Sequence, residues 1–208
     1  SLTTITIPDS VTSIGSSALS KCSGLTSITI PDSVTSIGRS AFSKCSGLTS
    51  ITIPDSVTSI GAGAFNYCTG ELIVNCNIPS ASGYNYGAFY GSEFTSVTIG
   101  DSVTTIGSNA FYNCSSLTNI TIGHGVTTIE WDAFRFCDSL TSVTIGDSVT
   151  SIGRYAFGMC TSLQEFKGNL ASEDGRCLII GGVLQAFAPA GITEYTIPDG
   201  VTAIGPTV

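Results

Sequence analysis

The fold is decided by residues 25–47, which read LTSITIPDSVTSIGRSAFSKCSG, and by the near copy LTSITIPDSVTSIGAGAFNYCTG at residues 48–70. The pattern recurs along most of the chain with a period of 23 residues. One apolar column keeps this period: Ile5, Ile28, Ile51, Val74, Val97, Ile120, Val143 and Phe166. A second column holds Cys22, Cys45, Cys68, Cys114, Cys137 and Cys160, with Gly91 in the one gap. A third holds Leu19, Phe42, Phe65, Phe111, Phe134 and Phe157.

A fixed period of roughly 20–29 residues, headed by L-x-x-L-x-L, is typical of a leucine-rich repeat solenoid. A single copy cannot bury its apolar face alone, so stacked coils must share one continuous core. We therefore expect one domain over residues 1–208. Its coils are expected at about residues 1–23, 24–46, 47–69, 70–92, 93–115, 116–138, 139–161 and 162–208.

Each coil is expected to contain a strand, two bends and a closing turn. Alternation within residues 25–30 predicts a short parallel strand with Ser27 and Thr29 facing outward. The Pro-Asp-Ser turn that follows ends the strand, because proline has no amide donor and aspartate favours a local turn. Gly38 marks a second bend, and residues 41–45 are expected to form one helical or 3₁₀ turn.

The coil at residues 70–92 departs from the pattern. Glu71 replaces the leading leucine, Cys76 takes a strand isoleucine position, and Tyr84 replaces the glycine of the second bend. Glu130 replaces the same glycine in a later coil. Since the bend accepts both residues, we expect that it does not require a positive φ.

After residue 166 the period fails. Two apolar runs, 177–180 and 183–188, are separated by Gly181-Gly182, which is the pattern of a β-hairpin. We expect this hairpin as an insertion at about residues 168–191. The repeat then returns with the sequence YTIPDGVTAIG at residues 195–205.

Composition narrows the classes of function. Only 11% of residues are charged, which is too few for disorder, and 42% apolar residues suffice for a continuous core. A net charge of −8, with seven Lys and Arg, argues against nucleic acid and anionic lipid as partners. The sequence shows no signal peptide, lipidation motif or membrane span. Because it begins inside a repeat, we interpret it as a mature fragment or a truncated chain whose targeting segment is missing.

The repeat motif, with A-F-x-x-C after it, closely resembles the BspA-like leucine-rich repeat family of bacterial cell-surface proteins. The segments SEDGRCLII (172–180), FAPAG (187–191) and YTIPDG (195–200) strengthen this resemblance, which covers nearly the whole chain. It implies a curved solenoid that is secreted to the extracellular face of a bacterium and takes part in adhesion. It brings no catalytic motif, and the coil at 70–92 departs from it.

The cysteines could form disulfides or bind a metal. They lack C-x-x-C spacing and a companion histidine, and side chains stacked in parallel disfavour the disulfide torsion. Buried free thiols are therefore favoured, for Cys76 and Cys177 outside the column as well.

The turn aspartates could form a calcium ladder, and the only histidine could be a general base. The aspartate column is Asp9, Asp32, Asp55, Asp101 and Asp147, interrupted by Ile78 and His124. One carboxylate per coil is too few for about six to eight oxygen ligands, so turn capping is favoured. His124 has no assignable nucleophile beside it and is favoured as an exposed turn residue. We expect no metal and no cofactor.

Positions that vary among the copies are free to carry function. The outward strand columns hold mainly Ser and Thr, whereas the columns after the second bend and around the cysteines gather aromatic residues and Arg in later coils. Trp, Tyr and Arg are enriched at binding hot spots. The candidate binding residues are therefore Trp131, Arg154, Tyr155, Tyr112 and Arg135. In the alternative, these rings only cover the coil edge, and Trp131 forms a cation–π pair with the neighbouring Arg154.

Three functions remain open from the sequence. The leading hypothesis is a non-enzymatic module that binds protein or glycan ligands at a cell surface, because a repeat array makes a long rigid surface. A spacer that presents another domain is the alternative, since the first coils are nearly identical. A hydrolase is least favoured, because no acid–base pair can be placed. The oligomeric state is not fixed by the sequence.

Overall fold

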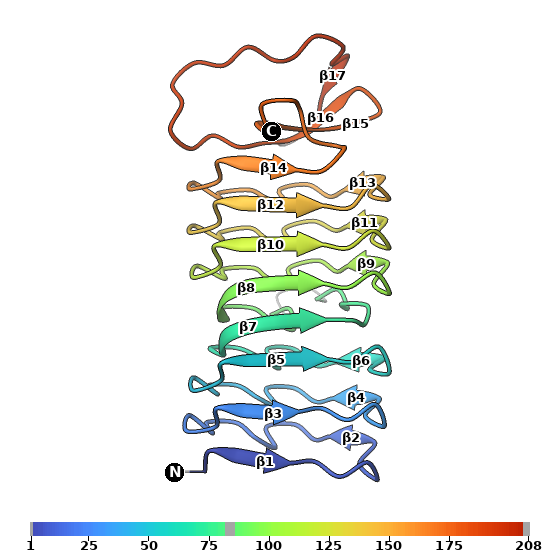
Figure 1. Cartoon of the computed structure of the whole chain (residues 1–208), viewed down its shortest axis with the longest axis vertical. Coiled ribbons are helices and arrows are strands. Elements are labelled where there is room, and N and C mark those ends of the chain that lie inside the picture. The colour runs from blue at the N-terminus through green and yellow to red at the C-terminus, as the bar shows by residue number, and fades with distance from the viewer. Residues whose placement is uncertain (1, 82–85, 206–208) are drawn as a thin grey trace.

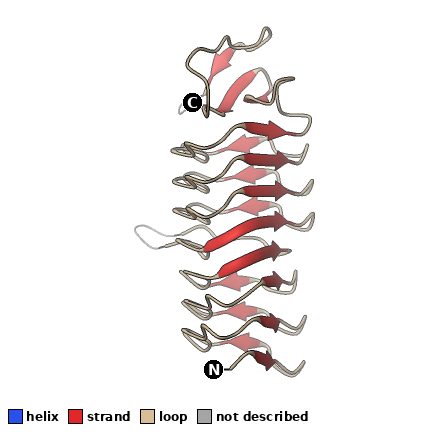
Figure 2. Cartoon of the chain, turned by 60° about the vertical axis from the view of Figure 1, so that its left-hand side comes forward, coloured by secondary structure: helices blue, strands red, loops and turns tan. Residues whose placement is uncertain are grey.

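The structure is a computed structural model that describes residues 2–81 and 86–205. Its coils are stacked along one axis, from the N-terminus at the bottom of Figure 1 to the hairpin at the top. Two views show a nearly straight stack, whereas the family resemblance implied a curved one (Figures 1 and 2). Tyr84, which the sequence places at the second bend, and residues 1 and 206–208 lie outside the described residues.

The strand of each coil forms a parallel sheet along one face. At the N-terminal end, β1 (Thr4–Thr6) pairs with β3 (Ser27–Thr29) in the predicted 23-residue register. A six-stranded sheet follows in the order β14-β12-β10-β8-β7-β5. Its strands are β5 (Ser50–Ile53), β7 (Thr69–Val74), β8 (Glu93–Ile99), β10 (Asn119–Ile122), β12 (Ser142–Ile145) and β14 (Glu165–Lys167). Isoleucine and valine alternate inward with outward Ser and Thr, as predicted.

A second set of short parallel strands lies across the core from the first. It comprises two three-stranded sheets, β2-β4-β6 and β9-β11-β13. The strands are β2 (Ser13–Ile14), β4 (Ser36–Ile37), β6 (Ser59–Ile60), β9 (Thr105–Ile106), β11 (Thr128–Ile129) and β13 (Ser151–Ile152). The departing coil separates the two sheets, because there only Ile78 forms a bridge, to Ile106.

The expected helical closing turn is wrong. Within the described residues the coils close through hydrogen-bonded turns, and Figure 2 shows strands and loops only. Two residues per turn have a left-handed backbone, such as Ser40 with φ 54° and Lys44 with φ 65°. A left-handed residue cannot continue a right-handed helix, so each turn ends after a few residues.

A stack of phenylalanine rings runs through the core. Neighbouring centroids lie 4.7 to 5.3 Å apart along Phe42, Phe65, Phe89, Phe111, Phe134 and Phe157. Phe166 meets the last ring edge-on at 5.5 Å. Phe89 lies one residue beyond the 23-residue spacing of the predicted phenylalanine column, but it is fully buried and fills the gap in that column. Each stacked pair adds about 0.5–1.5 kcal/mol to the burial of its rings.

The coil at 70–92 stays in the stack by changing its spacing. Leu72 pairs with Ile51 on one side and Val97 on the other. The 23-residue column predicted Val74 between these two residues, and this prediction is wrong by two positions. Glu71 faces outward on β7 and does not replace the leading leucine. The period is restored in the next coil.

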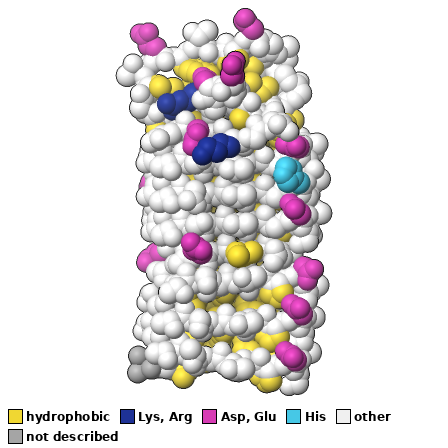
Figure 3. All heavy atoms as spheres, in the orientation of Figure 1, with side chains coloured by type: hydrophobic (Ala, Val, Ile, Leu, Met, Phe, Trp, Pro, Cys, Tyr) yellow, Lys and Arg dark blue, Asp and Glu magenta, His cyan; other side chains and the backbone are white. Residues whose placement is uncertain are grey.

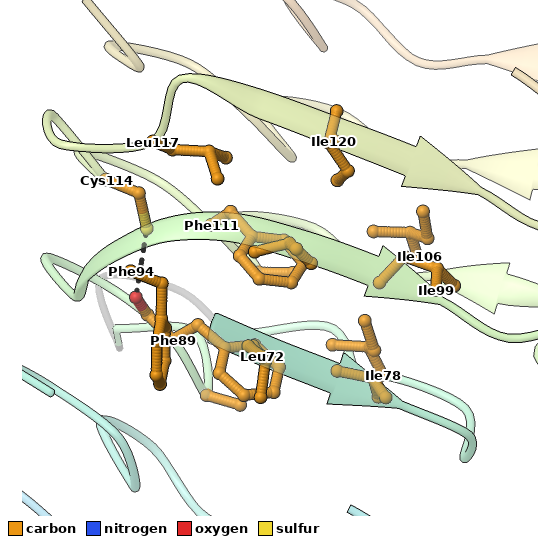
Figure 4. Close-up of a cluster of buried hydrophobic side chains, with 14 of the residues drawn as sticks. Leu72, Ile78, Phe89, Phe94, Ile99, Ile106, Phe111, Cys114, Leu117 and Ile120 are labelled. Carbon is orange, nitrogen blue, oxygen red and sulfur yellow. Dashed lines mark hydrogen bonds between the residues drawn. The ribbon is translucent and has the colours of Figure 1, made fainter. Parts of the chain in front are cut away.

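The placement of Ile78 by the 23-residue period is also wrong, at the second set of strands. The sequence placed it in the aspartate turn column, but only 2% of its surface is exposed, and Figure 4 shows it packed inward near Leu72 and Ile106. Cys76 is buried as predicted. Phe94 is buried at the leading position of the following coil.

The cysteines are free thiols that line the core beside the phenylalanines. Seven are buried as predicted, and Cys22 is partly exposed. The column thiols donate to the backbone carbonyl at the phenylalanine position of the preceding coil, as Cys114 does to Phe89 at 3.1 Å (Figure 4, dashed line). In the departing coil this place belongs to Ser92, not Gly91, because its buried hydroxyl lies 3.2 Å from the Cys114 sulfur.

The predicted hairpin is present. β15 (Cys177–Ile180) pairs antiparallel with β16 (Val183–Phe187) around Gly181-Gly182. β17 (Ala203–Ile204), from the returning repeat, then pairs parallel with β16. The insertion is fixed to the last coil by the amide of Ala190, which donates to the carbonyl of Leu163 at 3.0 Å.

Candidate functional site

The variable side chains start from the two left-handed positions of each closing turn. The first position is Ser17, Ser40, Gly63, Asn109, Asp132 and Tyr155, and the second is Lys21, Lys44, Tyr67, Gly91, Asn113, Phe136 and Met159. Their φ values lie between 54° and 66°. The glycines of the second bend are absent from this set, which confirms that the bend does not require a positive φ. The left-handed positions were not predicted, although the Gly and Asn residues in both columns were a usable signal.

Aromatic rings form a ladder along this turn edge. Tyr86 and Tyr90 have centroids 3.9 Å apart, Tyr90 stacks on Tyr112 at 5.8 Å, and Tyr112 meets Phe136 edge-on at 5.3 Å. Partial burial, together with the neighbouring tyrosines, raises the pKa of Tyr90. Tyr90, Tyr112 and Phe136 in the middle of the ladder are partly buried. Tyr86 at its end is 52% exposed.

Two arginines extend the ladder toward the hairpin. The Arg135 guanidinium lies 4.9 Å from the Phe136 ring and 4.8 Å from the Tyr155 ring. The Arg154 guanidinium lies 5.0 Å from the same Tyr155 ring. Asp132 accepts from Arg135 at 3.2 Å. We call this ladder with its arginines and the neighbouring Trp131 the aromatic edge; its members are Tyr86, Tyr90, Tyr112, Trp131, Arg135, Phe136, Arg154 and Tyr155.

The predicted neighbours are adjacent in the backbone, but their side chains pair differently. Asp132 donates its amide to the carbonyl of Arg154 at 3.0 Å, so the two columns lie side by side. The Arg154 side chain lies on Tyr155 and not on Trp131, which corrects the expected cation–π pair. Among the residues that the structure describes, none forms a hydrogen bond, ring stack or cation–π contact with the Trp131 indole, which is 47% exposed.

A pocket of about 380 Å³ opens where the aromatic edge meets the hairpin. Arg135, Tyr155 and Met159 line it from the coils, and Gln185, Phe187 and Pro189 line it from the insertion. The sequence placed Arg135 and Tyr155 in a binding patch, but it could not place the hairpin against them.

The other face of the stack carries few charges. Figure 3 shows a mostly uncharged surface over the first sheet, with acidic side chains and the histidine along the edge where the strands end. His124 is exposed, and its backbone amide donates to the Asp101 carboxylate at 2.7 Å. Aspartate thus caps the turn of the next coil. In the described ranges, no group of three or more His, Cys, Asp or Glu side chains is placed to hold a metal ion.

Fold and edge together define the class: a parallel β-solenoid of leucine-rich repeats whose variable side chains gather on the closing turns. The sequence model of the BspA type leucine rich repeat region matches six copies, over residues 1–84 and 82–208. The chain belongs to this family. No curated protein matches it. No helix long and apolar enough to cross a bilayer occurs in the described part of the chain.

Solved structures of bacterial leucine-rich repeat proteins resemble the chain. One from Eubacterium ventriosum is 26% identical with a TM-score of 0.59, covering 94% of this chain and 45% of its own. The Treponema protein TpLRR (T. pallidum) is 20% identical with a TM-score of 0.51 over 77% of each chain, a likeness of fold alone. A leucine rich cell surface protein from Faecalibacterium prausnitzii is 28% identical over 86% of this chain and 62% of its own, with a TM-score of 0.37. The chain thus spans less than two thirds of the first and third of these relatives.

Proposed function

We propose that the chain is a non-enzymatic binding module at the extracellular bacterial cell surface, and that it binds protein or glycan ligands along the aromatic edge. Membership of the BspA-type family supports the surface location. The edge supports the binding role, because it gathers the Trp, Tyr and Arg side chains that dominate binding hot spots.

The backbone at the edge carries this proposal. A left-handed conformation costs an L-residue about 1–2 kcal/mol, and Gly and Asn adopt it most easily. The first two coils have Ser and Lys at these positions, whereas Tyr67, Phe136 and Tyr155 place bulky rings there in later coils. Rings at such positions are chosen against backbone preference, which points to a use for their exposed faces.

The spacer function draws support from a different part of the chain. The first two coils have Ser and Lys at both left-handed positions, and no aromatic residue. We infer that these coils extend the module, while the later coils bind. A catalytic role stays the least favoured, because His124 is exposed and its hydrogen bond to Asp101 is made by the backbone amide and not by the imidazole.

The chain itself supplies the variant that tests the binding role. Trp131→Ser, Tyr155→Asn, Arg154→Ser, Tyr112→Asn and Arg135→Asn introduce only residues that other coils carry in the same columns. We expect the variant carrying all five to keep its circular dichroism spectrum and to lose at least about tenfold in affinity for the ligands that the wild type binds on a panel of immobilised mucin, collagen and host glycans.

The matched control carries Arg39→Ser and Lys44→Asn in the second coil, which has no aromatic residue at its left-handed positions. It should bind like the wild type. Equal binding by the wild type and the later-coil variant would remove the aromatic edge as the binding surface. A wild type that binds none of the panel would leave the spacer as the better description.

A further inference from the structure

The pocket beside the hairpin is built from two rigid walls. On the insertion side, the Arg176 guanidinium donates to the carbonyls of Ala188 and Ala190, at 3.1 and 2.9 Å, on either side of Pro189. The Phe187 ring packs against Tyr195 at 4.8 Å. On the coil side, Phe157 ends the stack of core rings. A pocket held in this way is preformed, which reduces the ordering that a ligand must induce.

The lining of the pocket selects an apolar group. Phe157, Met159 and Pro189 contribute rings, a thioether and aliphatic carbon, while Arg135 and Gln185 supply long polar side chains at the wall. A volume of about 380 Å³ falls at the lower end of small-ligand sites, which hold roughly 300–1,000 Å³. An aromatic amino-acid side chain matches such a lining better than a sugar does, because each sugar hydroxyl needs a hydrogen-bond partner when it is buried.

The rim of the pocket selects an anion. Arg135 and Arg154 both lie within about 5 Å of the Tyr155 ring, and Asp132 neutralises only the first of them. Within the described residues, Arg154 has no carboxylate partner. Two of the seven Lys and Arg residues of a chain with net charge −8 are thus concentrated at one spot. Such a local reversal of sign steers an acidic partner.

We propose that the pocket takes an aromatic side chain from a protein ligand, and that an acidic residue next to that side chain contacts Arg154. This assignment rests on the binding function proposed above and narrows its ligand to an acidic, aromatic segment of protein. The hairpin insertion then has a function: it supplies the second wall that a regular coil would lack.

Met159 gives a direct readout, because it is the only methionine in the sequence and it lines the pocket. The full chain, labelled with ¹³C at the methionine methyl, is titrated with the peptide Gly-Ser-Phe-Glu-Glu-Gly, and Met159→Leu assigns the signal. We expect a saturable shift of this signal. Replacing the Phe of the peptide by Ala, or both Glu by Lys, should abolish the shift.

Two variants separate charge from packing. Arg154→Ser should weaken the peptide about tenfold, whereas Arg39→Ser, in the same column of an early coil, should leave the affinity unchanged. Gln185→Trp, which narrows the pocket from the hairpin side, should also weaken the binding of the peptide.

Other results would overturn the assignment. An unchanged Met159 signal with every peptide, while mucin or collagen still binds at the aromatic edge, would reject the pocket but keep the proposed function. A saturable shift with sialyllactose in place of the peptide would assign the pocket to a glycan. Loss of both kinds of binding would reject the two proposals together.

Discussion

At the scale of the residue, close backbone approach and not backbone angle explains the glycine of the second bend. The glycine of the second bend has an ordinary φ, yet a Cβ built on Gly38 would meet the backbone nitrogen of Ser16 at 2.5 Å and the carbon of Gly15 at 2.8 Å. Gly153 meets Trp131 in the same way. The glycine column is therefore a contact between coils, and it repeats because the coils repeat.

Substitution of this glycine gives a matched pair. Gly38→Ala should lower the free energy of unfolding by about 1–3 kcal/mol, because backbone atoms must move to admit the methyl group. Gly15→Ala, in the same column of the first coil, has nothing within 4 Å of the new Cβ and should change stability by less than about 0.5 kcal/mol. Urea unfolding measures both, and equal effects would contradict the contact explanation.

The buried thiols make a prediction about alkaline pH. Burial raises the pKa of Cys76 from 9.0 to about 11. The unfolded chain releases this proton at the lower pH, so the stability is fully present below about pH 9 and is lost as the pH rises from about 9 to about 11. Cys76→Ala should show a smaller loss than the wild type over this interval in urea unfolding. Parallel pH profiles for the two proteins would be inconsistent with a buried thiol.

At the scale of the element, one coil can be adjusted while its neighbours stay regular. Glu130 stands in the glycine column and turns its carboxylate toward the preceding coils, where it accepts from the amide and hydroxyl of Ser108 and the hydroxyl of Ser80. Burial alone would raise the pKa of Glu130, but these hydrogen bonds outweigh it and lower the pKa. The carboxylate thus links the departing coil at 70–92, which carries Ser80, to the regular coils on its C-terminal side.

Glu130→Ala should lower the free energy of unfolding by about 1–3 kcal/mol near neutral pH, because the Ser108 donors lose their partner. A carboxylate whose pKa is lowered by folding stabilises the fold above its ordinary pKa, and this is lost as the pH falls through the folded value. The difference between wild type and Glu130→Ala should therefore shrink in acid. A constant difference across the acid range would refute this role.

The sequence predicted the regular elements because one physical constraint, the shared core, repeats every 23 residues. It predicted the hairpin from Gly181-Gly182 for a similar reason, since the turn is local. It placed Val74, Ile78 and Gly91 in columns that belong to other residues, because a coil can shorten one turn and lengthen another without changing its neighbours. The pocket could not be predicted, because its walls come from segments whose contact depends on the tertiary fold.

At the scale of the whole molecule, the stack has one continuous core, and the variable aromatic and arginine side chains lie along one edge. Buried apolar residues continue from coil to coil, including through the departing coil at 70–92. The stack of phenylalanine rings also continues through this coil, by way of Phe89. The first two coils have no aromatic residue at their left-handed positions, and the later coils carry rings and arginines next to the hairpin. In the function we propose, rigidity and recognition depend on different columns of the same repeat.

The most direct test of the shared core is the stability of Ile78→Asp beside His124→Asp, measured by urea unfolding. Both positions fall in the aspartate column of a uniform 23-residue repeat, but only Ile78 is buried, whereas His124 is exposed. An unpaired carboxylate in the core costs several kcal/mol, so Ile78→Asp should lose about 4 kcal/mol or fail to fold, and His124→Asp should stay within about 1 kcal/mol of the wild type. An Ile78→Asp protein as stable as the wild type would contradict a continuous core through this coil.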